Sequence, residues 1–150
     1  MEITITPADL DATDVARLVE AHAAFCDDTA PPGSCHRLTL DGLRAPGITM
    51  WTARDAGSAL LGMVGLGALG PLGGEVKSMH TTAAARGAGV AKRLMQILTE
   101  EATARAYPAL WLETGIHPDF DAARRLYWSL GFRPCPPFGS YQHDPHSVFL

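Results

Sequence analysis

Apolar residues recur along this chain with two periods, and the change from one period to the other marks the expected elements. Alternation with polar residues predicts strands, whereas repeats at three and four residues predict helices. The clearest helical repeat covers residues 87–106, and Pro108 prevents its continuation. The apolar face of this helix is expected to consist of Val90, Leu94, Ile97, Leu98 and Ala102.

The two periods together predict an order of elements for the whole chain. The N-terminal part is predicted to contain a strand over 2–6, a helix that Asp9 or Asp11 caps, a loop over 27–34 and a short helix over 38–43. Strands are predicted over 48–53, 60–69 and 75–81, followed by the long helix and a strand over 109–113. The last predicted elements are a helix that Asp119 or Asp121 caps and Gly131 ends, a strand from Phe132, and a strand over 147–150. This β-α-α-β-β-β-α-β-α-β-β order predicts an α/β chain, an α+β mixed sheet with helices on both faces. No repeat, low-complexity tract or linker interrupts it, so residues 1–150 are expected to form one domain.

Composition narrows the classes of protein. A chain of 150 residues with 47% hydrophobic composition can bury a substantial core. The net charge of −4, without a basic block, disfavours nucleic acid as a partner. No apolar run reaches membrane-spanning length, so we expect a cytoplasmic protein with no leader and no membrane partner. The 3 cysteines lack paired spacing, which predicts reduced thiols. The oligomeric state stays open, a homodimer included.

Three short motifs suggest other kinds of site, and their contexts argue against each. Residues 65–70 match GxGxxG, but Pro71 and further glycines follow where a dinucleotide site needs a helix. Lys77 and the serine after it resemble the end of a P-loop, but Val76 stands where that motif needs glycine. The HDPH stretch at 143–146 has no partner motif, which favours a surface loop over a metal site. We therefore expect no metal.

The stretch from Arg86 to Ala91 places glycine-rich backbone at the start of the long helix. The first amides of a helix have no internal partners, and the helix dipole makes that end positive. Gly87 and Gly89 lack a Cβ and let an anion approach the chain, while Arg86 adds a positive charge. This combination is typical of a phosphate or pyrophosphate site. The alternative is a glycine-rich turn that binds no ligand.

Two motifs in this half of the chain resemble the GNAT superfamily of acetyltransferases. Arg86-x-x-Gly89-x-Ala91 has the form of that family's acetyl-CoA loop, (Gln/Arg)-x-x-Gly-x-(Gly/Ala). Residues 75–80 are similar to the family's fourth strand, and residues 123–132 resemble its A-x-x-L-Y-x-x-x-G-F segment. The strong resemblance covers about residues 75–132, and the N-terminal part agrees only in its order of elements.

The resemblance implies the GNAT acyl-CoA N-acyltransferase fold, with acetyl-CoA as co-substrate. It implies that the CoA pyrophosphate binds the backbone amides of Arg86, Gly87, Ala88, Gly89, Val90 and Ala91. The backbone of Met79, His80 and Thr81 would pair with the pantetheine arm, where the fourth and fifth strands splay apart. Two positions depart from the family pattern: Phe120 replaces a common asparagine, and alanines at 83–85 replace a common proline.

Acetyl transfer to an amine needs one group that takes a proton from the ammonium and another that protonates the leaving thiolate. Glu75 is the first candidate for the base. It resembles the glutamate that acts as the base in histone-acetylating members of the superfamily, which lies on the fourth strand at the same spacing from the acetyl-CoA loop. A solvated glutamate at the start of a strand is the other interpretation. His36, His80 and Glu113 are rival candidates, and the loop of His36 could border the substrate cleft. Strand alternation predicts that His80 faces away from Glu75, so the two are not expected to line one pocket.

Tyr127 is the candidate acid for the leaving group. It shares a helix stripe with Ala123, Leu126 and Leu130, and this position alone favours a core tyrosine with an anchored hydroxyl. The resemblance instead implies that its hydroxyl points at the CoA sulfur.

Residues 134–141 are stiff, aromatic and rich in proline. They resemble a small bacterial GNAT branch that ends in a PPFG-x-Y-x-x-DP-x-S-x-F-like segment. We expect Phe138 and Tyr141 to line the acceptor pocket. A packed loop over the sheet edge is the alternative.

The sequence therefore predicts an N-acetyltransferase that moves an acetyl group from acetyl-CoA to a primary amine of a small molecule. No cysteine lies in a motif for an acetyl-cysteine intermediate, so direct attack in a ternary complex is expected. The alternatives are a protein or peptide N-acetyltransferase, a non-catalytic acyl-CoA-binding sensor and a nucleotide-binding module. The identity of the acceptor is not readable from the sequence.

Overall fold

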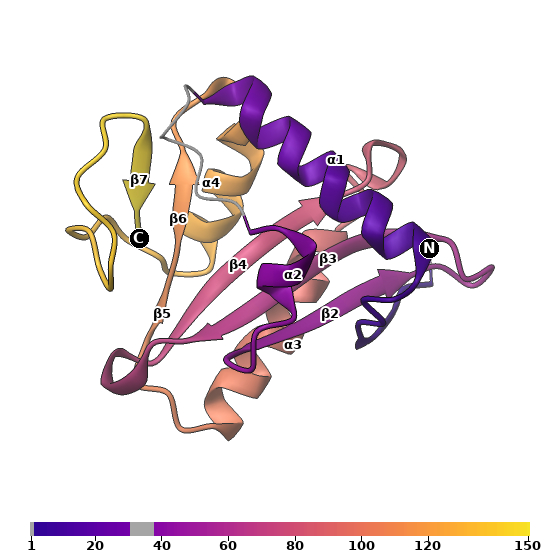
Figure 1. The fold of residues 1–150 in the computed structure, drawn as a ribbon, viewed down its shortest axis with the longest axis horizontal. Coiled ribbons are helices and arrows are strands. Elements are labelled where there is room, and N and C mark those ends of the chain that lie inside the picture. Colours follow the sequence, from indigo (N-terminus) through magenta and orange to yellow (C-terminus); the bar gives the residue numbers. More distant parts are fainter. Residues whose placement is uncertain (1, 31–37) are drawn as a thin grey trace.

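The computed structural model describes residues 2–30 and 38–150. At its centre lies a mixed sheet of five strands in the order β1-β2-β3-β4-β5 (Figure 1). These strands are β1 (Thr4–Pro7), β2 (Ile48–Arg54), β3 (Leu60–Ala68), β4 (Gly74–Thr81) and β5 (Leu110–Trp111). The first four are antiparallel neighbours, and β5 runs parallel to β4. The remaining two strands, β6 (Glu113–Gly115) and β7 (Ser147–Phe149), form a separate antiparallel pair.

Helices cover both faces of the sheet, as the sequence predicts (Figure 1). One face carries α1 (Thr13–Thr29) and the short α2 (Leu40–Leu43), and the other carries α3 (Val90–Ala104). Helix α4 (Asp121–Ser129) follows β6. Three single 3₁₀ turns complete the described structure: η1 (Gly70–Leu72), η2 (Ala83–Ala85) and η3 (Pro118–Phe120).

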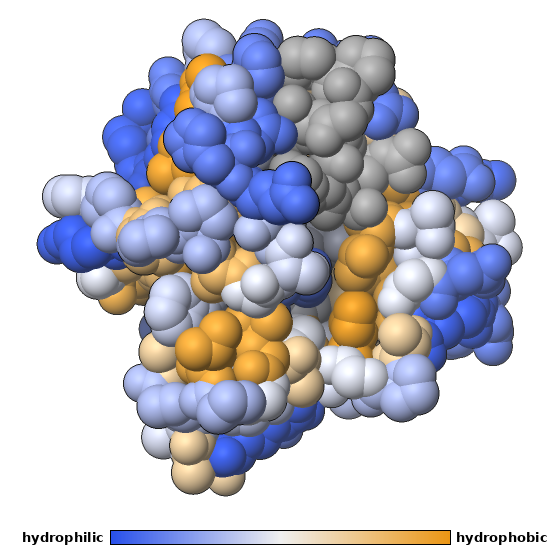
Figure 2. Space-filling view, turned by 60° about the vertical axis from the view of Figure 1, so that its left-hand side comes forward, coloured by the Kyte–Doolittle hydropathy of each residue, from blue (hydrophilic) through white to orange (hydrophobic). Residues whose placement is uncertain are grey.

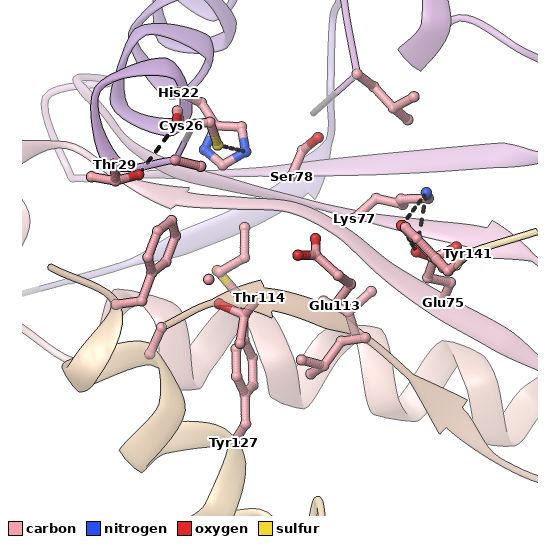
Figure 3. Close-up of a pocket in the computed structure, with 18 residues that line it drawn as sticks. His22, Cys26, Thr29, Glu75, Lys77, Ser78, Glu113, Thr114, Tyr127 and Tyr141 are labelled. Carbon is pink, nitrogen blue, oxygen red and sulfur yellow. Dashed lines mark hydrogen bonds and ion pairs between the residues drawn. The ribbon is translucent and has the colours of Figure 1, made fainter. Parts of the chain in front are cut away.

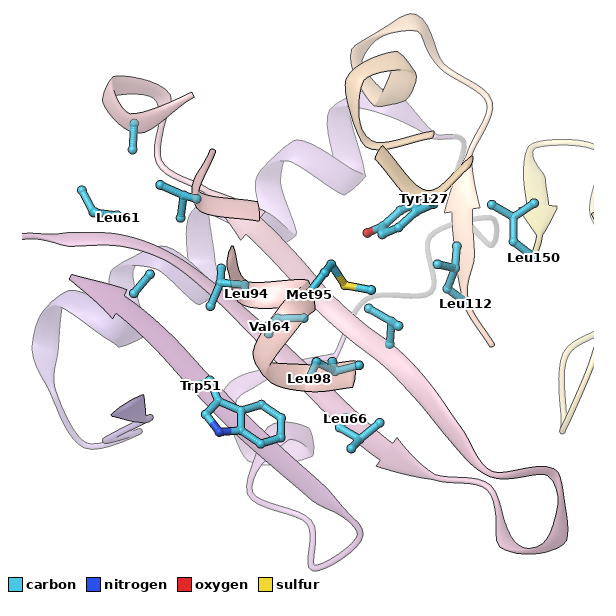
Figure 4. Close-up of a cluster of buried hydrophobic side chains, with 14 residues drawn as sticks. Trp51, Leu61, Val64, Leu66, Leu94, Met95, Leu98, Leu112, Tyr127 and Leu150 are labelled. Carbon is cyan, nitrogen blue, oxygen red and sulfur yellow. The ribbon is translucent and has the colours of Figure 1, made fainter. Parts of the chain in front are cut away.

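Two hydrophobic cores form because side chains alternate between the faces of each strand. Trp51 packs in the larger core under α3, and its neighbour Met50 packs in the smaller core under α1. Leu94, Met95 and Leu98 of α3 are fully buried against the sheet (Figure 4). The helical repeat in the sequence therefore identifies the face of α3 that packs against the sheet.

Several element boundaries differ from the predictions. The long helix begins at Val90 rather than residue 87, because Gly87 and Gly89 take positive φ angles of 82° and 81° and form a turn. Ala12, not an aspartate, is the N-cap residue of α1; the Asp9 side chain instead accepts a hydrogen bond from the Asp11 amide. That helix continues to Thr29, through the first residues of the predicted loop.

The C-terminal part departs further from the predictions. Phe120 is the N-cap of α4, and Asp121 is its first residue. The strand predicted over 109–113 breaks into β5 and β6. No strand begins at Phe132, because the prolines after it lack the amide hydrogens that a ladder needs.

On the face shown in Figure 2, separate apolar patches interrupt a mostly polar surface. Large apolar side chains exposed within the described ranges are Leu72, Ile116, Trp128 and Leu130. None of the helices in the described ranges is long and apolar enough to cross a bilayer.

Because Leu94 is fully buried between α3 and the sheet, L94A should lower the free energy of unfolding by about 2–5 kcal/mol. Chemical denaturation followed by circular dichroism measures this change. Q96A is the matched control, since Gln96 is exposed on the same helix and its loss should change stability by less than about 0.5 kcal/mol. Equal effects of the two variants would contradict the assignment of this core.

Candidate active site

The edge of β4 loses its strand neighbour partway along its length. Its pairing with β5 consists of Gly74 with Leu110 and Glu75 with Trp111. The chain then turns away, and β6 pairs with β7 instead. A cavity opens in the gap, with β4 residues 76–79 on one wall and residues 112–115 on the other. This is the splay of strands that the resemblance implies, and we call the space the first cavity.

A bulge interrupts β4 just beyond this point. Ser78 has a φ of 50°, and the register with β3 shifts there, so that Lys77 lies opposite Gly65 while His80 lies opposite Met63. Met63 packs in the core under α1, and residues two apart on β3 face the same side. Lys77 and His80 therefore both face α1, although they are an odd number of positions apart along the strand.

The bulge corrects the prediction from strand alternation for His80. Glu75 lies opposite Gly67, on the same side of the sheet as Met63. Glu75 and His80 thus both face α1, and the prediction that they face apart is wrong, because it assumed a regular strand. They still line different spaces: Glu75 lines the first cavity, and His80 lines a second one beside it.

The second cavity brings together almost all of the predicted cofactor residues. Met79, His80, Thr81, Arg86, Gly87, Gly89, Val90 and Ala91 line it, and only Ala88 of the predicted set does not. Its other wall is α4, through Ala122, Ala123, Leu126 and Tyr127.

The turn before α3 presents its amides without a protein cap. No side chain caps the helix, and the amides of Gly87, Gly89, Val90 and Ala91 donate to no other residue in the described ranges. The Ala88 amide alone is taken, by the carbonyl of Ala85 at 3.3 Å. Such a set of amides at the positive end of a helix can bind a diphosphate.

Arg86 stands at the entrance to these amides. Its guanidinium lies 5.7 Å from the centre of the Phe25 ring, which comes from α1. The side chain is exposed and lines the second cavity, so its charge can add to that of the helix end.

Tyr127 rises from α4 into the wall that the two cavities share (Figure 3). Its side chain is 5% exposed, and its ring packs edge-on against Phe132. Its hydroxyl forms no hydrogen bond with another residue that the structure describes, so the anchored phenol expected of a core tyrosine is not seen. Burial raises the pKa of the Tyr127 phenol, which keeps it protonated and able to donate at neutral pH.

A polar cluster of Glu75, Lys77 and Tyr141 forms one end of the first cavity (Figure 3). The Tyr141 hydroxyl donates to Oε2 of Glu75 at 2.6 Å, and Nζ of Lys77 lies 3.1 Å from the same oxygen. Glu75 is 4% exposed, so its charge is buried with two donors beside it. Burial and the Glu75 carboxylate raise the pKa of Tyr141, which keeps this donor protonated.

The other predicted site residues are distributed unevenly. Glu113 lines the first cavity from β6. Phe138 does not; it is buried against Trp111, Tyr141 and Phe149, as in the packed-loop alternative. His36 lies outside the described residues. Within residues 2–30 and 38–150, no three His, Cys, Asp or Glu side chains are grouped as a metal site requires.

The sequence analysis missed two residues of α1. His22 lines both cavities and Cys26 lines the first, with the Cys26 sulfur 3.7 Å from Nε2 of His22 (Figure 3). Their spacing of four residues places them on one side of a helix, and this was the available signal. Which side of α1 faces the gap in the sheet depends on how the helix crosses β4, and no local pattern reports that.

Comparisons with known proteins agree with this geometry. Residues 15–132 match the model of the acetyltransferase (GNAT) family. The uncharacterized N-acetyltransferase YsnE of Bacillus subtilis is 44% identical over 142 residues, which cover 95% of this chain and 93% of that protein. The IAA acetyltransferase of Azospirillum brasilense is 36% identical over 137 residues, covering 91% and 88%. A solved GNAT-family acetyltransferase from Staphylococcus aureus superposes with a TM-score of 0.76 at 18% identity, covering 99% and 98%. The chain therefore belongs to the GNAT family of acetyltransferases and is an N-acetyltransferase.

Proposed function

We propose that this enzyme transfers the acetyl group of acetyl-CoA to a primary amine of a small molecule by direct attack in a ternary complex. The observation that carries the proposal is the wall common to the two cavities. His22, Met79, Phe120, Ala123 and Tyr127 line both. A thioester in one cavity and an amine in the other would meet at this wall, so no covalent acetyl-enzyme is needed to carry the group between them.

The second cavity suits acetyl-CoA in each of its parts. The amides at the start of α3 and the Arg86 guanidinium would bind the pyrophosphate. The edge of β4 at Met79–Thr81 has no strand neighbour in the described part of the chain, so its backbone can hydrogen-bond to the pantetheine arm. The bulge at Ser78 turns the backbone where the thioester carbonyl would lie, which supports a role in polarising it.

In the proposed reaction the acceptor amine is the nucleophile and Tyr127 is the acid. A neutral amine attacks the thioester carbon, the C–N bond forms and the C–S bond breaks. Tyr127 gives its hydroxyl proton to the CoA sulfur, and the nitrogen of the collapsing intermediate restores that proton to the phenol. The ammonium form of the amine must lose one further proton to a base before it attacks.

The first cavity supports an acceptor that arrives as a cation. Its described lining contains the carboxylates of Glu75 and Glu113 and the single ammonium group of Lys77. Glu75 accepts a hydrogen bond from Tyr141 and forms an ion pair with Lys77, which fixes the position of its carboxylate, and we propose that it binds the ammonium group of the acceptor. The role of general base predicted for Glu75 stays a prediction.

A small acceptor is favoured over a protein or peptide. The relative that is 36% identical is named for acetylating IAA, a small molecule. The hydroxyl of the buried Tyr127 at the junction favours an enzyme over a non-catalytic acyl-CoA sensor.

Acetyl-CoA at 100 times its Kd should stabilise the protein by about 2.7 kcal/mol, because it binds only the folded chain. R86A should weaken acetyl-CoA binding about 10- to 100-fold, since a hydrogen bond to a charged group contributes about 1.5–3 kcal/mol. Calorimetry measures both, with R125A on the exposed side of α4 as the matched control. Unchanged affinity in R86A, or tighter binding of ATP or NAD than of acetyl-CoA, would contradict the cofactor assignment.

Y127F should lower kcat about 10²- to 10⁴-fold, because it removes a general acid. The affinity for acetyl-CoA should stay the same, since the hydroxyl has no partner to lose among the described residues. Thiol release in the presence of a panel of primary amines measures the rate, and Y107F, away from both cavities, is the control. A Y127F enzyme within threefold of the wild type would exclude Tyr127 as the acid.

E75Q should raise KM for the acceptor about 10- to 100-fold, because the amide cannot form an ion pair with the ammonium group. Steady-state kinetics at saturating acetyl-CoA tests this expectation, and thermal melting checks that the fold survives the loss of the ion pair with the half-buried Lys77. The exposed Glu100 gives the matched control, E100Q. An unchanged KM with a lost kcat would instead assign Glu75 to the chemical step.

A further inference from the structure

Two histidines face each other across the junction of the cavities, one from α1 and one from β4. Nδ1 of His22 lies 3.0 Å from Nδ1 of His80, and the ring centres are 5.0 Å apart. Phe25, one turn along α1, packs edge-on against the His80 ring. His22 lines both cavities, whereas His80 lines the second cavity and the groove beyond it. The pair thus extends from the first cavity, where the acceptor would bind, to the groove beyond the second cavity.

The short contact constrains where the protons sit. Burial, and then the charge of Arg86, lowers the pKa of His80 to about 4, so His80 is neutral at pH 7. Two Nδ1 atoms at hydrogen-bond distance require one donor and one acceptor. When His80 carries its hydrogen on Nε2, its Nδ1 accepts from Nδ1 of His22. The lone pair of His22 is then on Nε2, the nitrogen nearest the Cys26 sulfur in the first cavity.

We propose that Nε2 of His22 is the general base that takes the proton from the acceptor ammonium, and that His80 is the residue that positions it. This inference rests on the proposed acetyl transfer. The proton passes from the amine nitrogen to Nε2, and the resulting imidazolium donates its Nδ1 hydrogen to Nδ1 of His80. The free amine then attacks the thioester as described above. Solvent takes the proton from His22 after the products leave.

The charges around the pair support this role. Glu75, Lys77, Glu113 and Tyr141 face the first cavity with His22, Cys26 lies on the same helix, Tyr127 faces it from α4, and Arg86 lies beside His80. The carboxylates favour a positive charge on His22, and Arg86 opposes it. Because Arg86 is also expected to bind the pyrophosphate, acetyl-CoA would neutralise the opposing charge and favour proton uptake in the ternary complex.

The test compares H22N with E75Q and the wild type over a range of pH. Asn at position 22 retains an amide that can donate to His80 but has no basic nitrogen. With the primary amine that gives the fastest thiol release, H22N should lose about 10²-fold or more in kcat at pH 7. Its rate should recover as the pH approaches the pKa of the amine itself, since free amine needs no base. The wild type and E75Q should share the same decline of kcat/KM at acid pH, whereas in H22N the decline should begin at alkaline pH, near the pKa of the amine.

Variants of His80 test its positioning role. The amide oxygen of H80N can replace Nδ1 as the acceptor, whereas H80L cannot, so H80N should retain most of kcat and H80L should lose about tenfold with a shifted acid limb. Melting temperature and acetyl-CoA affinity check the fold of each variant. H143N, an exposed histidine outside both cavities, is the matched control.

Three results would overturn the inference. The first is an H22N enzyme that keeps wild-type kcat and the acid limb. The second is an E75Q enzyme that loses that limb, which would make Glu75 the base. The third is a long-range ¹H–¹⁵N NMR spectrum without a hydrogen on Nδ1 of His22 at pH 7, a readout that needs no turnover. Absence of thiol release by the wild type with any amine would instead defeat the proposed function, whatever the spectrum shows.

Discussion

The structure depends on the point where β4 stops pairing with β5. Backbone N–H and C=O groups need hydrogen-bond partners. When a strand loses its neighbour, these groups must bond to other groups or to solvent. Here the loss occurs directly after Glu75 and Trp111, on the β5 side of the five-stranded sheet. It opens the first cavity between the strands and leaves the outer half of β4 with an unpaired edge. This one interruption of the sheet would provide both binding sites: the acceptor would bind in the first cavity, and the cofactor would bind along the edge of β4.

Positive and negative groups lie at opposite ends of the site. The start of α3 and Arg86 provide positive potential at one end, where a pyrophosphate would lie. At the other end, Glu75 and Glu113 provide negative charge for a cationic acceptor. Tyr127, buried and protonated, lies where the two regions meet. An anionic cofactor and a cationic acceptor are therefore each favoured in one cavity and disfavoured in the other, which orients both toward the shared wall.

Periodicity was enough to predict most of the fold, and the Gly-rich loop together with the family resemblance predicted most of the residues that line one side of the second cavity. The apolar repeat of α3 and the turn at Gly87 and Gly89 are local features, and local sequence reports them. The bulge at Ser78 is not readable in this way, since a serine at positive φ is held there by the surrounding sheet. His22 was missed for a similar reason, because its role depends on how α1 crosses β4. Phe138 was expected in the acceptor pocket, but packing among three aromatic rings places it in the core.

The bulge also determines what a shorter strand would lose. Because Ser78 and Met79 together lie opposite Val64, the residues after them are one step out of phase with those before. Deleting either residue would restore the regular pleat and leave His80 opposite Met63, so Lys77 and His80 would still both face α1. The facing of the site residues therefore survives such a deletion. What a shortened strand would lose is the turn of the backbone at Ser78, in the wall of the first cavity.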